Sequence, residues 1–369
     1  MPHDDPLAEG RRILTICNAC RYCEGYCAVF PVVEQCQDFG AEDLHYLANL
    51  CHNCAECYYA CQYAPPHEFA VNVPQVLAEI RLHSYRHYAR PQFLFRNSGR
   101  LTLAVLALAL VAGAMMLMIG GGQAFSPALS FYLVIPHGVM VAIFGGVSIL
   151  AVAAVGAGAV RQFAGVLRNT SRPVLKRAAR SILTLEYLSS GGVGCTYPNA
   201  RHSMARRWFH HCTFYRFLLC FASTTVAAYY HYVLARLAPY PYLSAPVVLG
   251  TLGGSGLLIG PAGLYWLKRQ RDLAIVDPAQ DGFDITFLAL LFVTSLTGLL
   301  LLAFRQSHWM GILLLIHLTT VLALFATVPY GKFIHGIYRA AALWRYAAGS
   351  CDGAGASGYS EESPKIDRL

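Results

Sequence analysis

Six stretches of this chain are apolar and long enough to cross a hydrocarbon core about 30 Å thick, and they constrain its fold more than any other feature. They cover residues 101–119, 131–157, 213–235, 245–267, 285–304 and 309–328. The sequence is 56% hydrophobic and 13% charged, which is far more apolar than a soluble globular protein. We therefore predict a mainly α-helical protein whose residues 101–345 form a bundle of six transmembrane helices.

Basic residues are distributed unequally around these runs. If the amino terminus is inside the cell, the external turns contain only Arg236 and Arg305, and most of the other Lys and Arg of this half fall in cytoplasmic segments. This is the positive-inside pattern. Residues 1–14 are charged and interrupted by proline, which argues against an export signal. We expect a multi-pass protein of a bacterial inner membrane with both termini in the cytoplasm, and its net charge of +8 then reflects topology rather than nucleic-acid binding.

Eight cysteines near the amino terminus repeat one spacing. They form two C-x2-C-x2-C-x3-C runs, made of Cys17, Cys20, Cys23 and Cys27 and of Cys51, Cys54, Cys57 and Cys61. Thiols in the cytoplasm are kept reduced, so this spacing indicates metal ligands rather than disulfides. In two-cluster ferredoxins the fourth cysteine of each run completes the neighbouring cluster. We therefore predict a ferredoxin-like, α-helical domain with two [4Fe–4S] clusters, one held by Cys17, Cys20, Cys23 and Cys61 and the other by Cys51, Cys54, Cys57 and Cys27.

A pair of zinc sites is the competing interpretation of these cysteines. Structural zinc normally uses two separated C-x2-C pairs, so iron–sulfur clusters are favoured. One departure from the ferredoxin run is that Pro31 and Pro65 come four residues after the fourth cysteine instead of directly after it. Cys195 follows no ligand spacing and lies in the Gly- and Pro-containing stretch 191–198, which we interpret as a connecting loop rather than a loop against a cofactor.

Histidines in the apolar half are candidate ligands of b-type haem, because an imidazole in a transmembrane helix is costly and two facing imidazoles suit a six-coordinate iron. His317 and His335 are 18 residues apart and return to one face of the sixth helix and its extension at about 100° per residue. His210 and His231 bracket the third helix. The antiparallel course of these helices predicts an outer pair, His231 with His317, and an inner pair, His210 with His335, and hence one or two haems.

Two other histidines remain as alternatives. His211 lies next to His210 but is about 160° out of phase with His231 on a helix. His137 in the second apolar run is the main rival of the ligands named above.

The chain accordingly divides into four parts. We predict a cytoplasmic cluster domain over 1–75, an interfacial linker over 76–100, the haem domain over 101–345 and a disordered tail over 346–369. The linker mixes arginines with tyrosines and phenylalanines, which suits the lipid headgroup layer. The same residues could bind a quinone near the inner haem, on the cytoplasmic side, and a site at the outer pair is the rival.

With these residues in place, the chain resembles the family of tricarballylate-utilisation protein B and citrate-utilisation protein CitB. The resemblance rests on the doubled cysteine run, the stretches 191–198 and 209–231, and the closing residues 329–335. It implies a subunit that takes electrons from a separate FAD-dependent dehydrogenase acting on a tricarboxylic acid and delivers them through clusters and haem to membrane quinone. The chain has no G-x-G-x-x-G fingerprint after a plausible strand, so the flavin belongs to the partner.

Two other classes of function compete with this one. A self-contained membrane haem oxidoreductase acting on oxygen or a tetrapyrrole precursor would need an open coordination position at its haem. A transporter with a redox or zinc sensor domain would need buried charges along a path, and apart from histidines the apolar runs lack them. No catalytic residue is predicted, because an electron carrier leaves the chemistry to its cofactors.

Overall fold

The computed structural model describes residues 3–36, 38–89, 131–168, 171–188 and 194–349, together with a few single positions between 92 and 110. In these parts the regular structure is helical, apart from one isolated β-bridge between Cys195 and Ser203. The expectation of a mainly α-helical protein is confirmed. Apart from those single positions, the predicted first transmembrane run, 101–119, lies outside the described residues. The predicted tail, 346–369, is described only as far as residue 349.

The amino-terminal head is a group of helices around one apolar core. Asp5 caps the first helix by accepting hydrogen bonds from the backbone N–H groups of Leu7 and Ala8. Leu14, Leu44 and Ile80, each 0% exposed, bring three of the helices together. The helices of the head are α1 (Pro6–Cys20), α2 (Val29–Gln35), α3 (Ala41–Leu50), α4 (Glu56–Tyr59) and α5 (Val73–Tyr88).

The helix α5 extends the head beyond the boundary expected from the sequence. Most of its residues are buried, including Tyr85 at 1% exposed, and it packs against α1 and α3. The expected boundary at residue 75 therefore falls inside a helix. Residues 76–88, expected to lie in the lipid headgroup layer, are part of the core of the head, because their apolar face has the period of a helix.

The remainder of the chain contains long helices. In the part of the chain that the structure describes, four of them are long and apolar enough to cross a membrane: residues 137–162 of α9, α12, α13, and α14 with η4. The helices are α8 (Phe131–Val134), α9 (His137–Arg168), α10 (Arg172–Thr184), α11 (Ala205–Tyr232), α12 (Ala245–Arg269), α13 (Pro278–Ala303), α14 (Met310–Thr327) and α15 (Ile334–Ala348), with the short 3-10 helices η3 (Leu273–Ile275) and η4 (Val328–Tyr330).

The third predicted span corresponds to α11, which is long enough but less apolar than the other four. Arg216 lies in its middle, and Tyr229 and Tyr230 lie near its carboxyl end. The second predicted span is interrupted, because α8 ends before Pro136 and α9 begins at His137.

A break after α14 corrects one expectation about the sixth helix. His317 and His335 were expected on one face of a continuous helix, but α14 ends at Thr327 and η4 follows. Pro329 lacks a backbone N–H, and Gly331 is extended with ψ at 180°. His335 is therefore carried by a separate helix, α15.

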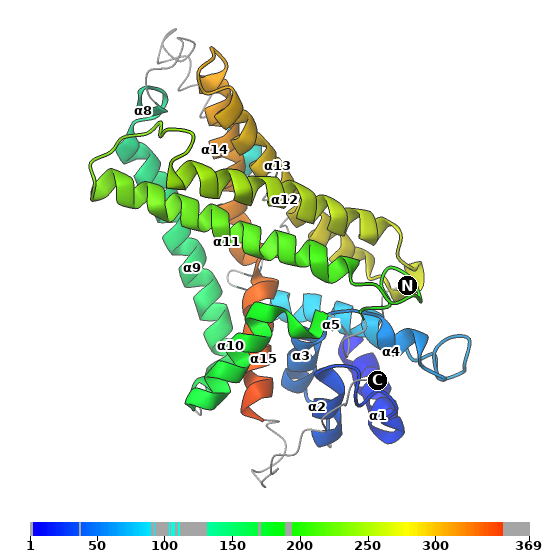
Figure 1. The fold of residues 1–369 in the computed structure, drawn as a ribbon. Helices are drawn as coiled ribbons and strands as arrows, with labels where there is room; N and C mark the ends of the chain where they lie inside the picture. Colours follow the sequence, from blue (N-terminus) through cyan, green and yellow to red (C-terminus); the bar gives the residue numbers. More distant parts are fainter. Residues whose placement is uncertain are drawn as a thin grey trace.

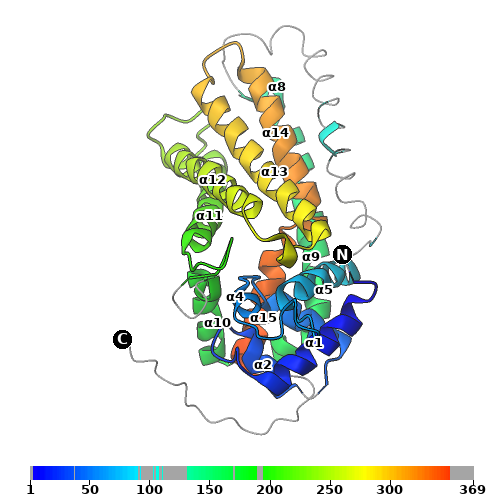
Figure 2. The same ribbon diagram turned by 90° about the vertical axis from the view of Figure 1, so that its right-hand side faces the viewer.

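Two views show how these elements are arranged. The head lies at one end of the molecule, and α15 and α10 run beside it, while α13 and α14 lead away towards the other end (Figure 1, Figure 2). The α11–α12 pair passes across α9 in Figure 1. Because α15 packs against α3 and α10, the carboxyl-terminal helix and the head share one end of the protein.

Candidate electron-transfer site

The first cavity of the head has a volume of about 210 Å³ and is walled by thiols. The cysteines that line it are Cys17, Cys20, Cys23, Cys57 and Cys61. Burial, together with the neighbouring thiols of Cys23, Cys61 and Cys20, raises the pKa of Cys17 to about 12. Thiols that hinder one another's ionisation in this way lose their protons together only when a metal centre takes the protons' place.

A second, smaller cavity adjoins the first and shares Phe30, Cys57 and Val73 with it. Its cysteines are Cys27, Cys51, Cys54 and Cys57. Burial raises the pKa of Cys57 far above its usual value, and its neighbours Cys54, Cys51 and Cys27 add to the effect. The fourth cysteine of each run thus lies with the first three of the other run, as the ferredoxin rule predicts. Each cavity presents the four thiols that a cubane cluster requires.

The loop that carries the second set of cysteines has an unusual backbone. Asn53 and Ala55 have φ angles of 56° and 66°, which is the left-handed region. These two positions turn the chain so that Cys51, Cys54 and Cys57 face one cavity.

Side chains from four other segments bind the backbone of this loop. Each of the five consecutive carbonyls from Leu50 to Cys54 accepts a hydrogen bond from one of them. Arg339 donates to Leu50 (2.9 Å), Arg81 to Cys51 (2.6 Å), Arg206 to His52 and Asn53 (2.7 Å each) and Thr196 to Cys54 (3.3 Å). We call these five interactions the loop clamp. Because its donors come from α5, α11, α15 and the segment before α11, the clamp joins the head to the rest of the chain.

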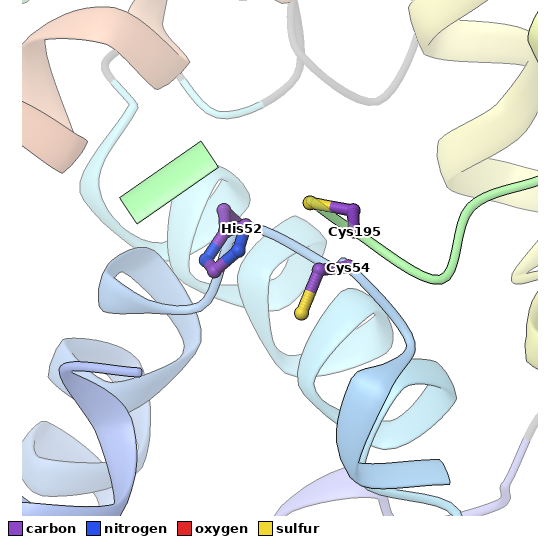
Figure 3. A group of neighbouring side chains, drawn as sticks. All are labelled: His52, Cys54 and Cys195. Atoms are coloured by element: carbon purple, nitrogen blue, oxygen red, sulfur yellow. The ribbon is translucent and has the colours of Figure 1, made fainter. Parts of the chain in front are cut away.

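Cys195 follows no ligand spacing in the sequence, but the structure places it beside the second cavity. Its thiol, 0% exposed, lies within 4.8 Å of ligand atoms of Cys54 and His52 (Figure 3). A β-bridge with Ser203 holds it there, and Gly194, with a φ of 102°, has no room for a side chain against that serine. The thiol donates to the carbonyl of Leu188 at 3.1 Å. Of the two interpretations of the stretch 191–198, the loop beside a cofactor site fits this placement.

The inner pair of histidines is brought together. The rings of His210 on α11 and His335 on α15 have centroids 6.2 Å apart and planes at 71°. Nδ1 of His335 hydrogen-bonds to the Lys332 carbonyl at 2.5 Å, which directs Nε2 away from that carbonyl. Nδ1 of His210 is buried without a partner among the described residues. Burial and then the charge of Lys332 lower the pKa of His335 to about 4. This imidazole is therefore neutral at physiological pH, as a metal ligand must be.

The outer pair is arranged differently from the expectation. His231 stacks on His137, with ring centroids 4.0 Å apart, and its Nδ1 lies 3.3 Å from the Tyr132 hydroxyl. His317 instead contacts α13, where its Nδ1 lies 3.1 Å from Thr297 Oγ1. Among the described residues His231 has a ring contact with His137 and none with His317. His211 is directed away from the inner pair, with Nε2 3.2 Å from the Thr184 carbonyl.

A third cavity, of about 370 Å³, lies where α5 meets α13 and η4. Its wall includes Arg86 and Lys332 and three phenylalanines, Phe283, Phe287 and Phe333. The ring of Phe287 is also 6.4 Å from the ring of His335. The cavity is therefore separated from the inner histidine pair by one layer of aromatic side chains.

Comparison with known proteins agrees with this arrangement. The model of the citrate utilization protein B Fer4-like domain matches residues 10–87, and that of citrate utilization protein B matches residues 94–356. The chain is 49% identical over 350 residues to citrate utilization protein B of Escherichia coli, covering 93% of this chain and 92% of that protein. No solved structure matches. A Fer4-like head and helices long enough to cross a membrane, in a chain matched over nearly its whole length, show that it belongs to the citrate utilization protein B family.

Proposed function

We propose that this protein is the membrane electron-transfer subunit of an oxidoreductase complex. It takes electrons from a partner FAD-dependent dehydrogenase acting on citrate, tricarballylate or a related acid, and passes them through two [4Fe–4S] clusters and b-type haem to the quinone pool. The observation that supports this most strongly is the pair of adjacent cavities, each of which brings together the first three cysteines of one run and the fourth cysteine of the other. The thiols of these cavities would hold the clusters, which supply one-electron chemistry.

A short route links the second cavity to the inner histidines. Arg206 binds the loop of the second cavity and lies four residues before His210 on α11. Arg339 binds the same loop and lies four residues after His335 on α15. Each haem histidine is thus about one helical turn from an arginine of the loop clamp. We assign the two ends of the route to the second cluster and a haem held by His210 and His335.

A second haem would use the outer histidines. The stacked rings of His137 and His231 do not direct their in-plane nitrogens at each other, so these two are not an axial pair as they lie. His317 therefore stays the predicted ligand of this site, with His231 as its partner and His137 as the alternative.

The third cavity is the proposed quinone site. Arg86 and Lys332 can donate hydrogen bonds to quinone carbonyls, and the phenylalanines can pack against the ring. The cavity borders Leu82 and Arg86, residues of the segment for which a quinone role was predicted. We place this end of the protein in the cytoplasm, at the inner membrane, on the basis of the charge pattern of the sequence.

The assignment of cofactors is tested on the purified full-length protein. We expect eight non-haem iron atoms and eight sulfides per chain, EPR signals of two [4Fe–4S] clusters after reduction, and the optical spectrum of a b-type haem unresponsive to carbon monoxide. Zinc in place of iron and sulfide, or a chain without haem, would contradict the proposal.

The quinone site is tested by filling the cavity. Phe287→Trp should abolish reduction of a soluble quinone analogue by the dithionite-reduced protein, and leave reduction of the haem unchanged. Phe304→Trp, at the exposed far end of α13, serves as the matched control. If Phe287→Trp reduces quinone as the unmodified protein does, the acceptor site lies elsewhere, and the outer histidines become the first place to examine.

A further inference from the structure

We propose that Arg206 and Arg339 raise the reduction potential of the second cluster above that of the first, so that electrons are directed from the surface of the head towards the haem. This inference rests on the proposed function, since it concerns the two clusters that the cysteines would hold. It assigns a role to residues that neither ligate a cluster nor bind haem.

The first observation is the density of donors on one loop. Three guanidinium groups and one hydroxyl bind the five carbonyls from Leu50 to Cys54, and Arg81 also donates to Ala48 at 2.7 Å. Among the described residues, a single arginine donates to a backbone carbonyl of the first run, and this is the exposed Arg21, bonded to the carbonyl of Asn18 at 3.2 Å. The cationic groups are therefore concentrated at the second site.

The second observation is that the two guanidinium groups lie within electrostatic range of the second site. The charge of Arg339 interacts with the thiols of Cys51 and Cys27, which are predicted ligands, and the charges of Arg206 and Arg339 both act on the neighbouring His52 and Cys195. Burial lowers the pKa of Arg339 to about 10, so its guanidinium stays protonated at neutral pH. The carboxylate of Glu56 acts on Cys23 of the first site and also lines the second cavity, so the arginines are what distinguishes the two sites.

These differences have a direct effect on reduction. A reduced cluster carries one more negative charge than an oxidised one, and a buried cation nearby is only weakly screened from it. Cations and donated hydrogen bonds therefore favour the reduced form of the second cluster, where they are concentrated. One electron leaves the first cluster and one enters the second, with no bond made or broken. The partner's reduced flavin supplies the electron, and the oxidised haem accepts it.

The experiment is a redox titration of the full-length protein followed by EPR. Arg206→Gln and Arg339→Gln keep an amide donor and remove the charge, and each should disfavour reduction of one cluster about tenfold, equivalent to about 59 mV for one electron. The other cluster provides an internal reference and should not move. Arg206→Lys and Arg339→Lys keep the charge and should retain most of the potential. Arg207→Gln is the matched control, since Arg207 donates to Thr184, on the side of α10.

The two cluster potentials of the unmodified protein give a second test, which does not depend on the arginine variants. Cys54→Ser alters a predicted ligand of the second cluster and so identifies its EPR signal. That signal should belong to the cluster of higher potential. Equal potentials, a lower potential for the cluster that Cys54→Ser perturbs, or equal shifts of both clusters in the Gln variants would overturn the inference. A protein without two cluster signals would contradict the proposed function instead.

Discussion

At the scale of single residues, His335 is held as a haem ligand usually is. Its Nδ1 bonds to the backbone carbonyl of Lys332, which fixes the ring and would leave Nε2 to coordinate a metal. His210 reaches the same space from α11, and its ring centroid is 6.2 Å away. Two rings at this distance leave room for a metal between their nitrogens.

We therefore expect His210→Ala and His335→Ala to lose the same haem. Both variants should keep their full content of cluster iron, because neither residue touches a cluster thiol. Haem and iron assays of the purified variants measure the two effects separately. His211→Ala is the control, since its ring faces Thr184 and its removal should leave the haem in place. Full haem content in both test variants would show that the inner pair is not a ligand pair.

A buried histidine cluster in the head should make its stability depend on pH. His45 is 3% exposed, and its Nε2 lies 3.0 Å from Nδ1 of His83, with His87 and Tyr88 against its ring. Burial, together with the charges of His83 and His87, lowers the pKa of His45 from 6.5 to about 4.

Between pH 6.5 and 4 the unfolded chain binds a proton at His45 that the folded head does not bind. The free energy of unfolding should therefore fall as the pH is lowered through this window, by up to about 3 kcal/mol from this residue. Thermal unfolding of the head as a function of pH measures the slope. His45→Gln should flatten it, and an unchanged slope in that variant would assign the acid sensitivity to other groups.

The cysteine sets were predictable because the ferredoxin spacing is local and repeats. Cys195 was not predictable, because 140 residues separate it from Cys54 and its neighbours in the sequence include no second ligand type. The histidine pairs lie between these cases. Helical phase and an antiparallel arrangement gave the inner pair, but the stacking of His137 on His231 depends on how α9 packs against α11, and no spacing in the sequence records that.

At the scale of elements, small residues allow α11 and α12 to approach each other closely. A Cβ placed on Gly260 would lie 2.8 Å from the backbone nitrogen of Thr213 and 3.0 Å from the carbonyl of Phe209. Gly253 meets the backbone of Cys220 at 2.9 Å in the same way. The spacing of small residues in α12 is thus explained by helix packing.

Gly260→Ala should separate these two helices and destabilise the protein by about 1–3 kcal/mol, the usual cost of overpacking. Since α11 carries His210, the haem content should fall along with the melting temperature. Gly145→Ala in α9 is the matched control, because a Cβ there meets no atom within 4 Å. Equal melting temperatures for the two variants would show that the α11–α12 contact is not limiting.

The break between α14 and α15 shows where periodicity fails as a guide. The 18-residue spacing of His317 and His335 fits one straight helix, but Pro329 and Gly331 lie between them. These residues end α14 by removing a backbone donor and by adopting an extended conformation. The composition predicted apolar helices here correctly, and local backbone chemistry decided where they end.

At the scale of the whole molecule, α15 attaches the head to the rest of the chain. Arg345, 5% exposed, lies 3.5 Å from Asp43 and 4.2 Å above the ring of Tyr46, both on α3. Arg339 binds the carbonyl of Leu50 one and a half turns earlier on α15. One face of α15 thus meets the head at two levels.

Removing Arg345 should loosen this contact without dismantling the cofactor sites. We expect Arg345→Ala to increase backbone amide exchange in α3 and α15 by roughly tenfold or more, since truncating one partner of a buried pair costs about 2 kcal/mol or more. Cluster and haem contents should not change. Lys176→Ala, exposed on α10, is the control. Unaltered exchange in α3 would indicate that the apolar contacts of α15 alone hold the head.

The loop clamp also has a consequence for the order in which the protein is made. Every residue that lines the first cysteine cavity lies between Ile16 and Val73, so that cavity is complete once the head has been synthesised. The second loop requires donors at positions 81, 196, 206 and 339, and the last of these leaves the ribosome only after helices α9 to α14 have been made. The two cysteine cavities therefore reach their final surroundings at different times during synthesis, and only the second waits for α15.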